Sequence, residues 1–485
     1  PYHAENDWTC RSPVKKNTLT DDRVTAFTAG PQNGRVYSRM ALSKLGRVAL
    51  RVPSQVRWES ELAQSFAPGQ GRQQLVIIGT GWGGYSVLRN VDKKLFDVTV
   101  ISPRNHFLFT PLLASTTVGT LEFRSIIEPV RNAGFRDEKH FHLAEATGVD
   151  VHRNVVKCRN ALDANNIREY EVKYDQLIIA CGAVPNTFGT PGVYEHAFFL
   201  KEVADARAIR NRILRNFEIS VRPGISEAEQ KRLLHIVIVG GGPTGIEFGA
   251  ELYDFVQEDV RRLFRSETQH VRVTIVEAMK ILPSFDHDLQ TYATNKINER
   301  RQMELVHDRV IRVDANSVTL SDGTIVPSGL VVWSTGLAPR EFTNSVRFEK
   351  NGRGQLVTDS ELLCHGENPC RNVYALGDCA DVKHSSLPCT AQAAERAGRY
   401  LAKSLSARVE GKEVKPFVFN NLGMLAYIGE YRALSNFSFF KASGHSAWVL
   451  WRLAYATRLG SWRLRMQVPM DWLKSFIFGR DTSRF

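Results

Sequence analysis

The stretch Leu75-Val-Ile-Ile-Gly79-Thr-Gly81-Trp-Gly-Gly84 decides the fold, because its pattern recurs at Ile236-Val-Ile-Val-Gly240-Gly-Gly242-Pro-Thr-Gly245. In each copy an apolar run leads into G-x-G-x-x-G, and a second apolar run follows, at 98–101 and at 273–276. Each copy therefore predicts a strand, a tight glycine turn, a helix and a second strand. Only glycine lets the backbone approach a pyrophosphate this closely, and the free N–H groups of the next helix bind it. Two copies in this context predict two dinucleotide sites.

The residue after the second strand differs between the two copies. Glu277 ends the second copy, where a carboxylate can accept hydrogen bonds from both ribose hydroxyls and would repel a 2′-phosphate. This predicts NADH rather than NADPH. Glu277 lies 37 positions after Gly240, rather than about 20, and we assign the excess to a long polar helix over 251–266 and a loop. The first copy has Ser102 at this place, so its adenosine contacts must differ from the common pattern.

Two dinucleotide folds in one chain suggest a flavin enzyme that takes hydride from a nicotinamide, with the flavin fold split by the nicotinamide fold. Residues 174–182 predict a strand and turn that close the first part, and residues 331–336 predict a matching pair that closes the nicotinamide part. Residues 373–378 then predict a strand that ends in Gly-Asp. An aspartate at this place can accept a hydrogen bond from the flavin ribityl chain.

Composition and cysteine spacing exclude several classes of protein. The 485 residues are 43% hydrophobic and 24% charged, as in a globular enzyme. Seven cysteines, none in a C-x-x-C pair, argue against a disulfide scaffold, a zinc ribbon or a thioredoxin-type site. None lies between Cys10 and Cys158, where a disulfide reductase of this fold needs its redox pair. We find no run of 18 apolar residues and no D-x-D-x-D-G loop, and we expect no metal site.

The net charge of +12 lies in the two ends of the chain. Residues 1–71 hold ten Lys/Arg against six Asp/Glu, residues 431–485 hold nine against two, and residues 72–430 hold 44 against 43. A DNA-binding protein usually carries its basic face on the folded domain. The nearly neutral body therefore argues against nucleic acid, and the basic ends favour targeting and surface attachment.

The N-terminal segment has the composition of a mitochondrial transit peptide. Residues 23–58 contain seven basic residues and no acidic one, and residues 40–51 place bases among apolar residues at helical spacing. An Arg-rich, Ser-containing, acid-poor, amphipathic segment is typical of such peptides. We expect Met40 to be the true start and residues 1–39 to come from an upstream extension. A disordered basic tail is the alternative.

Longer motifs resemble one family, the type II NADH dehydrogenases, which are single-subunit NADH:quinone oxidoreductases of mitochondria and bacteria. The resemblance covers about residues 73–485. Its most specific pieces are Ser102-Pro-Arg-Asn-His-Phe-Leu-Phe-Thr110-Pro-Leu-Leu113, Val239-Gly-Gly-Gly-Pro-Thr-Gly-Ile-Glu247, Ala375-Leu-Gly-Asp378, Thr390-Ala-Gln392-Ala-Ala and Phe478-Gly-Arg-Asp-Thr-Ser-Arg-Phe485. The Ser-Pro-Arg segment is similar to the eukaryotic branch.

The resemblance implies an α/β protein with two dinucleotide-binding (Rossmann-like) domains of the glutathione-reductase type and a C-terminal amphipathic membrane-binding segment. FAD would occupy the first fold and NADH the second, and two electrons would pass to ubiquinone without proton pumping, at the mitochondrial inner membrane. A homodimer is compatible with this. The expected segments are targeting 1–70, FAD-binding 71–198 and 351–415, NADH-binding 199–350 and membrane-anchoring 416–485.

The resemblance also assigns residues. The turn at Thr110 would lie beside the isoalloxazine, and Glu247 near flavin and quinone would handle protons, although a helix-dipole role is equally open. Gln392 would contact quinone, with Arg396 one turn further on in place of a second Gln. The expected cofactor-binding residues are Gly79, Gly81, Gly84, Ser102, Pro103, Arg104, Thr110, Pro111, Ala180, Gly182, Gly377, Asp378, Ala391, Gly240, Gly242, Gly245, Glu277, Thr335 and Gly336.

The C-terminal region predicts a helix at a membrane surface. On a helical wheel Trp448, Trp451, Tyr455 and Leu459 share one side, which Arg452 and Arg458 flank. Such a helix can lie in the headgroup plane with its guanidinium groups snorkelling. Each basic residue near an anionic leaflet adds about 1 kcal/mol to the free energy of membrane binding. A helix packed on the body, or a dimer contact, is the alternative.

Three other functions stay open. A sulfide:quinone oxidoreductase would need a cysteine pair brought together by the fold. A cell-death-type flavoprotein would bind nucleic acid through a basic surface. A scaffold would keep both nucleotide sites without a reaction.

Overall fold

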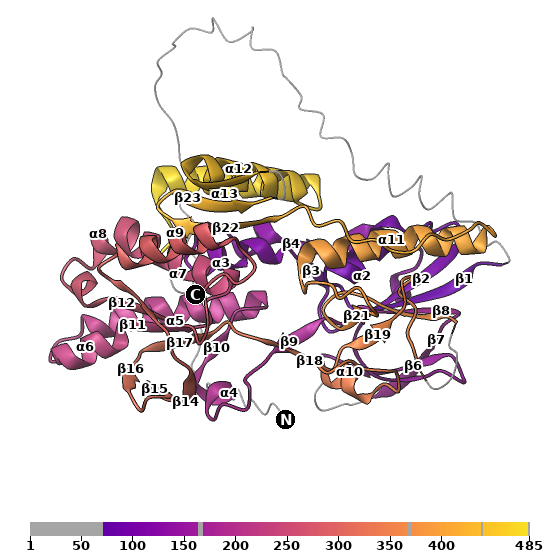
Figure 1. Ribbon diagram of the computed structural model, residues 1–485, viewed down its shortest axis with the longest axis horizontal. Helices are drawn as coiled ribbons and strands as arrows, with labels where there is room; N and C mark the ends of the chain where they lie inside the picture. Colours follow the sequence, from indigo (N-terminus) through magenta and orange to yellow (C-terminus); the bar gives the residue numbers. More distant parts are fainter. Residues whose placement is uncertain (1–70, 163–167, 367–370, 438–439, 484–485) are drawn as a thin grey trace, which may run out of the picture. The chain divides into compact units, whose positions relative to one another are not determined.

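The computed structural model describes residues 71–485, apart from 163–167, 367–370, 438–439 and 484–485. These residues belong to one compact unit, Glu61–Phe485 (Figure 1). The predicted targeting segment 1–70 and the start at Met40 lie outside the described residues.

The first glycine turn follows an inner strand, β1, of a seven-stranded sheet with strand order β20-β8-β1-β2-β5-β6-β7. It lies where the parallel strands have their carboxyl ends. Strand β1 (Gln73–Ile78) pairs in parallel with β2 (Phe96–Ser102) and β8 (Gln176–Ile179). Its apolar run is buried on both faces, as in parallel sheets generally. Strand β20 (Val373–Ala375) joins beside β8 from almost 200 residues further along the chain. The outer strands are β5 (Phe141–Asp150), β6 (Val155–Asn160) and β7 (Glu169–Lys173).

The second glycine turn follows the central strand of a five-stranded parallel sheet with order β10-β17-β11-β12-β13. All five strands lie in the sequence between β8 and β20, so the second sheet interrupts the first. The strands are β10 (Phe198–Phe199), β11 (His235–Val239), β12 (Arg272–Val276), β13 (Met303–Val306) and β17 (Leu330–Trp333). A small antiparallel sheet adds β14 (Val310–Asp314), β15 (Ser317–Leu320) and β16 (Ile325–Pro327).

Helices cover both sheets. Helix α2 (Trp82–Asn90) follows the first turn and packs closely on α11 (Ala391–Val409), where a Cβ at Gly398 would come within 2.5 Å of the Gly83 carbonyl oxygen. The remaining helices here are α3 (Leu113–Thr116), α4 (Val193–His196), α5 (Val203–Ser220), α6 (Glu227–Leu233), α9 (His287–Asn298) and α10 (Glu341–Ser345). Short strands β3 (His106–Leu108) and β4 (Ile127–Pro129) pair, as do β19 (Leu356–Thr358) and β21 (Ala380–Val382).

The helix after the second turn differs from the prediction of a polar helix over 251–266. Helix α7 (Pro243–Phe255) begins directly at the turn and runs through a π-helical turn (Val256–Val260) into α8 (Arg261–Leu263). Glu251 and Asp254 on it are buried, so the polar residues do not form a solvated face.

Two short strands connect the sheets. Strand β9 (Ala183–Pro185) pairs antiparallel with β18 (Leu337–Pro339), and each follows a glycine with positive φ, +70° at Gly182 and +67° at Gly336. The chain thus leaves the first sheet and returns to it through one paired linker (Figure 1).

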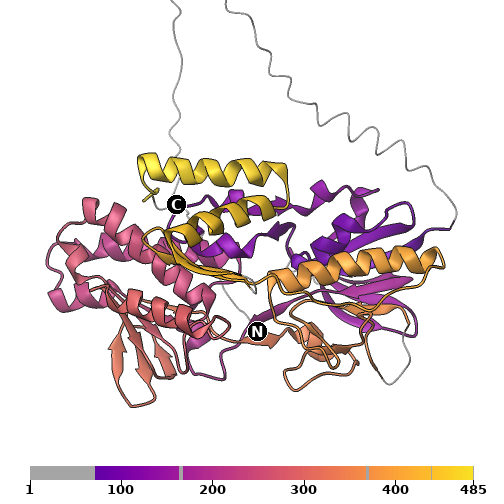
Figure 2. The same cartoon turned by 45° about the horizontal axis from the view of Figure 1, so that its top comes forward.

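The C-terminal region forms a layer of its own over α7. It consists of β22 (Met424–Gly429), β23 (Arg432–Asn436) and β24 (Lys441–Gly444), followed by α12 (His445–Arg458) and α13 (Trp462–Phe478). Figure 2 shows the two helices side by side above the three strands. Among the described residues no helix is long and apolar enough to cross a bilayer.

The prediction that the aromatic side of α12 faces a membrane is wrong. Trp451 and Leu459 are buried, and Trp448 and Tyr455 are half-buried. The ring of Trp451 lies 5.6 Å from that of Tyr427 in β22. The wheel identified residues that share a face, but the strands below, rather than lipid, cover that face.

Arg452 does not snorkel either. Its guanidinium lies 4.4 Å from the ring centroid of Trp448 and 4.6 Å from that of Trp472 on α13. Burial lowers the pKa of this guanidinium from its usual value. The side chain therefore joins the two helices through cation–π contacts.

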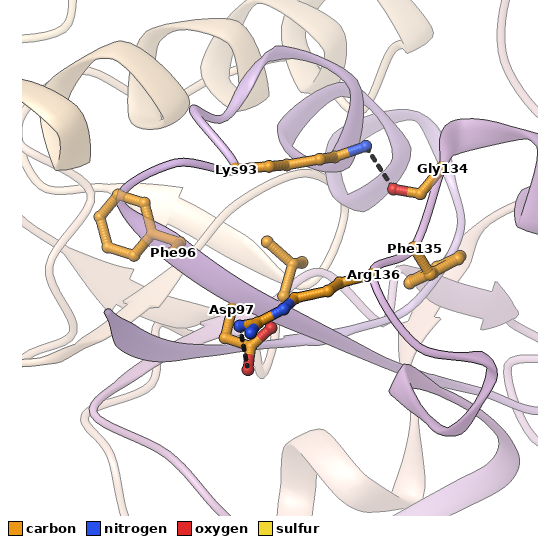
Figure 3. Close-up of a pocket in the computed structure, with 7 residues that line it drawn as sticks. Lys93, Phe96, Asp97, Gly134, Phe135 and Arg136 are labelled. Carbon is orange, nitrogen blue, oxygen red and sulfur yellow. Dashed lines mark hydrogen bonds and ion pairs between the residues drawn. The ribbon is translucent and has the colours of Figure 1, made fainter. Parts of the chain in front are cut away.

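A hollow of about 10 Å³ lies beside the N-terminal end of β2 (Figure 3). Lys93 Nζ donates to the Gly134 carbonyl oxygen (2.8 Å), and Arg136 pairs with Asp97 at 3.6 Å. The hollow holds about one water at most, and it lies at the opposite end of β2 from the glycine turn.

Candidate active site

The first glycine turn is shaped so that only glycine fits at two positions. Gly79 has φ +105°, and a Cβ there would lie 2.3 Å from the Ala180 carbonyl oxygen. A Cβ at Gly84 would lie 2.1 Å from the Gly79 oxygen. A Cβ at Gly81 would have an Arg104 nitrogen as its nearest neighbour, 3.8 Å away. No side chain caps the N-terminus of α2. The N–H groups at the start of α2 therefore have no side-chain partner and lie near a cation, which suits an anion.

The end of β2 explains the missing acid. Ser102 is buried and hydrogen-bonds to Thr80 in the turn (3.0 Å), and the Arg104 N–H donates to Ser102 (3.3 Å). The next residue, Pro103, is exposed. Arg104 also pairs with Glu202. The charged side chains beside the first turn are thus the Arg104–Glu202 ion pair, whose guanidinium can contact a phosphate.

The segment after β3 places Thr110 and Pro111 close to the start of α2. The Trp82 indole N–H donates to the Thr110 hydroxyl (2.9 Å), and Thr110 is exposed. The ring of Trp82 stands 5.0 Å from that of Phe107 and 5.2 Å from that of Phe109. This aromatic group fixes the turn predicted to lie beside the isoalloxazine.

The Gly-Asp end of β20 lies at the same edge. Gly377 has φ +79°, and a Cβ there would touch Ala394 at 3.5 Å, so the turn faces the first turns of α11, which starts at Ala391. Asp378 pairs with Lys201 at 3.6 Å. Burial lowers the pKa of Lys201. Sequence reasoning missed this lysine, because no motif marks a single base in the linker before α5.

These residues fit FAD. The turn at Gly79 and Gly84 leaves no room for side chains, the helix behind it is uncapped, and Arg104 faces the opening. The strand ends at Ala180 and Gly377 meet at the same edge of the sheet, since β8 lies between β1 and β20. A dinucleotide laid along this edge would meet backbone donors, a cation and a carboxylate in turn.

The second turn repeats the geometry. Gly240 has φ +113°, and a Cβ there would lie 2.7 Å from the Ser334 carbonyl oxygen and 2.9 Å from the Cβ of Thr335. A Cβ at Gly245 would lie 2.1 Å from the Gly240 oxygen. A Cβ at Gly242 would meet no other residue within 4 Å. Gly242 directly precedes α7, and no side chain caps the N-terminus of this helix. The structure thus brings these predicted glycines and Thr335 together.

Glu277 lies at the end of β12 in this second site. Its Oε2 accepts from the Gly241 N–H (2.7 Å) and its Oε1 from the Met279 N–H (2.9 Å). Each carboxylate oxygen keeps a free lone pair. The carboxylate is therefore fixed where a ribose bound on this turn would meet it.

Glu247 lies in the second turn of α7 and is buried beneath the C-terminal layer. Its Oε1 accepts from the Tyr427 backbone N–H (3.0 Å), and Trp451 and Tyr455 of α12 lie beside it. Burial, reinforced by nearby Glu251, raises the pKa of Glu247 to about 8. The group can therefore hold a proton at neutral pH and release it, as a proton donor must.

Gln392 and Arg396 both lie on α11 and hydrogen-bond to the same segment of chain, residues 420–423. The Gln392 amide donates to the Gly423 oxygen (3.3 Å) and accepts from the Leu422 N–H (2.9 Å), and Arg396 donates to the Asn420 oxygen. This segment leads into β22, whose Tyr427 reaches Glu247. Leu422, which bonds Gln392, and Tyr427, which bonds Glu247, are five residues apart. At about 3.3 Å per extended residue, at most roughly 17 Å separates them.

Sequence reasoning also missed the side chains around Glu247. Glu251 accepts from the hydroxyls of Ser115 (2.7 Å) and Thr120 (2.8 Å), and Asp254 accepts from the Tyr427 hydroxyl (2.5 Å). Their spacing after Glu247, four and seven residues, places them on one helix face, and this signal was available in the sequence.

Residues 73–398 match the family described as "Pyridine nucleotide-disulphide oxidoreductase", and residues 421–481 match "NDH2 C-terminal domain". The chain is 41% identical to the "Internal alternative NAD(P)H-ubiquinone oxidoreductase A1, mitochondrial" of Arabidopsis thaliana, over 85% of this chain and 86% of the relative. It is 36% identical to the "External NADH-ubiquinone oxidoreductase 2, mitochondrial" of Saccharomyces cerevisiae, over 93% and 88%.

Solved structures agree with these relatives. The structure of NDH2 from Plasmodium falciparum in complex with NADH matches with a TM-score of 0.79 and 27% identity, over 85% of this chain and all of that one. The sulfide:quinone oxidoreductase of Aquifex aeolicus matches with a TM-score of 0.62 and 16% identity, over 84% and 96%, which shows the fold alone. The predicted resemblance is confirmed: the chain belongs to the pyridine nucleotide-disulphide oxidoreductase family and, within it, to the type II NADH dehydrogenases, the mitochondrial NAD(P)H-ubiquinone oxidoreductases.

Proposed function

We propose that the chain is a mitochondrial, FAD-dependent NADH:ubiquinone oxidoreductase that transfers two electrons without pumping protons. The observation that carries this proposal is the pair of glycine turns, each followed by an uncapped helix, on a chain 41% identical to a mitochondrial oxidoreductase of this kind. The sulfide:quinone alternative has only a fold-level match at 16% identity.

The experiment is steady-state turnover of the purified protein with NADH and a short-chain ubiquinone. We expect NADH oxidation that depends on quinone, and no quinone reduction by sulfide. Sulfide-driven reduction without NADH turnover would favour the alternative enzyme. Salt-dependent DNA binding with slow quinone turnover would favour the cell-death-type flavoprotein.

The residues divide the work between the two sites. FAD, when bound, accepts hydride from NADH and passes electrons to quinone. Gly79, Gly81 and Gly84 bind its pyrophosphate, Arg104 neutralises phosphate charge, and Asp378 accepts a hydrogen bond from the ribityl chain. The segments 71–198 and 351–415 would form the flavin domain, and 199–350 the NADH domain between them.

In the NADH site, Gly240, Gly242 and Gly245 admit the pyrophosphate to the start of α7. Glu277 accepts hydrogen bonds from the ribose hydroxyls and repels a 2′-phosphate. The quinone site would lie near Glu247, which donates a proton, with Gln392 and Arg396 holding the segment that leads into β22.

A membrane-facing surface fits α13 better than the predicted face of α12. Apolar side chains on α13 recur at spacings of three or four residues and are exposed: Trp462 73%, Met466 58%, Met470 63%, Leu473 59% and Phe476 75%. Exposed apolar stripes of this kind mark membrane or protein contacts. Basic Arg465 and Lys474 lie on the same helix, and anionic headgroups attract bases.

We propose peripheral attachment to the mitochondrial inner membrane through this stripe. A homodimer through the same surface is the competing arrangement. Sedimentation with anionic vesicles distinguishes the two: vesicle binding supports the membrane face, and a stable dimer that ignores vesicles supports the other.

A further inference from the structure

The inward face of α7 carries a row of carboxylates. Glu247, Glu251, Asp254 and Glu258 follow one another at spacings of four, three and four residues, so they share one side of the helix and its π-helical turn. Glu251 is 4% and Asp254 3% exposed. Burying ionised carboxylates is costly unless each is paired. This row is therefore unusual for a helix that only fills a core.

The donors to the buried part of the row are hydroxyl and backbone N–H groups, whereas the outermost member, Glu258, accepts from the Arg480 guanidinium (2.7 Å). Glu251 accepts from Ser115 and Thr120, and Asp254 accepts from Tyr427 and from the Glu430 N–H (3.0 Å). The hydroxyl partners of Glu251 can stabilise either protonation state, since a hydroxyl can rotate to donate or accept. The row can therefore exchange protons without breaking its packing.

A cavity of about 50 Å³ adjoins the row beneath α12 and α13. Glu251 and Tyr427 line its inner part, and Glu258, with a side chain 41% exposed, lines it near the surface. This volume holds about three water molecules, and its polar lining gives them partners. Trp451, 3% exposed, also lines it and lies beside Glu247.

Asp259, the next carboxylate in the sequence, has a different kind of partner. Asp259 binds Arg480 twice, through Nη1 (2.8 Å) and through the backbone N–H (3.0 Å). Its partner is thus a charged guanidinium, which also bonds Glu258 (2.7 Å) and the Thr120 hydroxyl (2.9 Å). Asp259 offers a matched comparison: it is a buried carboxylate of the same helical segment that lies outside the cavity lining.

The reaction NADH + H⁺ + quinone → NAD⁺ + quinol consumes one proton from solvent in each turnover. We propose that water in the cavity delivers this proton to Glu251 and that Glu251 passes it one helical turn to Glu247, which donates it to the reduced quinone. The inference rests on the proposed function. In this scheme Glu251 is a relay residue, and Glu247 alone touches the substrate.

The charges around the row agree with this direction of transfer. Glu251, Tyr427, Trp451 and Tyr455 face Glu247, while Arg452 and Arg480 act on Glu251 through space. Burial raises the pKa of Glu247 to about 8 and that of Asp254 to about 7. Glu247 thus holds its proton up to mildly alkaline pH.

The test is Glu251→Gln in the holoenzyme, assayed with NADH against a short-chain ubiquinone and against ferricyanide. Ferricyanide takes electrons only, so it needs no proton. We expect quinone turnover to fall roughly tenfold to a hundredfold, as when a proton-transfer group is lost, and ferricyanide turnover to fall by less than about twofold. The solvent deuterium isotope effect on quinone turnover should rise, and Glu251→Asp should restore part of the rate.

Asp259→Asn is the control for structural damage. It should lower the unfolding temperature but leave the ratio of quinone to ferricyanide turnover unchanged. An infrared titration of the resting holoenzyme gives a readout without turnover. We expect a buried carboxylic acid band that Glu247→Gln removes and whose pH midpoint Glu251→Gln shifts.

Unchanged quinone turnover, isotope effect and infrared midpoint in Glu251→Gln would overturn the relay. A parallel fall with both acceptors, matched by Asp259→Asn, would also overturn it, since it would show loss of structure. Wild-type protein that fails to reduce quinone with NADH would instead sink the proposed function itself.

Discussion

At the scale of single residues, glycine and carboxylate positions decide the chemistry. Gly79 and Gly240 adopt left-handed backbone at the same place in two sheets, and a Cβ at either would collide with a backbone carbonyl oxygen. Glu277 is oriented by two backbone N–H groups before any ligand arrives. Such preorganisation lowers the cost of binding.

Replacing Glu277 with Gln should relax the preference for NADH. The amide keeps one acceptor oxygen but loses the charge that repels a 2′-phosphate and strengthens the ribose contact. We expect the ratio of kcat/KM for NADH over NADPH to fall by roughly tenfold, because hydrogen bonds to charged groups contribute about 1.5–3 kcal/mol. Glu304→Gln, in the neighbouring strand β13, is the control. Unchanged selectivity would mean that another residue sets the preference.

Glu247 also predicts how stability depends on pH. Its pKa in the folded protein is raised to about 8 from 4.5, so the folded state binds the proton more tightly than the unfolded chain. This contribution is complete below pH 4.5 and is lost as the pH rises through 8. Asp254, with a raised pKa of about 7, acts in the same direction. Thermal unfolding from pH 5 to 9 should show a steeper decline for wild type than for Glu247→Gln; parallel curves would contradict the assignment.

At the scale of elements, the C-terminal layer connects the predicted quinone residues. Gln392 and Arg396 on α11 hold residues 420–423, and the strand that follows reaches Glu247. A change at the start of α11 can therefore act on Glu247 through β22. Helix α13 exposes an apolar stripe on the outside of this layer.

Gln392→Ala should raise the KM for quinone more than the KM for NADH. The substitution removes both hydrogen bonds to the segment 422–423, which is remote in sequence from the second glycine turn. We expect a change of roughly fivefold to thirtyfold for quinone, since each of the two lost hydrogen bonds costs about 1 kcal/mol. Gln392→Glu keeps the acceptor for the Leu422 N–H and should have a smaller effect. Equal changes in both KM values would remove Gln392 from the quinone site.

The double substitution Met470→Glu and Leu473→Glu should release the protein from anionic vesicles. Both side chains are exposed on α13, so the change removes apolar surface and adds negative charge without disturbing the core. The control is Ile325→Glu, an equally exposed apolar residue on β16. Sedimentation with vesicles is the measurement, and continued binding by the double variant would place the anchor elsewhere.

At the scale of the whole molecule, the repeated glycine pattern was sufficient to predict two dinucleotide folds, one inserted in the other. The pattern succeeds because a buried parallel strand followed by Gly-x-Gly has few other structural solutions. The Gly-Asp of 377–378 was predicted from its place in the chain, and β20 joins the first sheet as expected.

Contacts between distant segments were beyond the sequence. The wheel of α12 identified an aromatic face, but only the fold shows that β22 covers it. The polar helix predicted over 251–266 gave no sign that Glu251 and Asp254 would be buried, and Lys201 carried no motif. For Glu251, Asp254 and Lys201 the partner lies more than 100 residues away in the chain.

The central claim is electron transfer between two dinucleotide sites of one chain, and anaerobic stopped-flow absorbance at the flavin band tests it most directly. NADH mixed with the purified holoprotein should bleach the flavin band in a single rapid phase, and ubiquinone added next should restore it completely. A band that NADH leaves unchanged, or that ubiquinone fails to restore, would contradict the account.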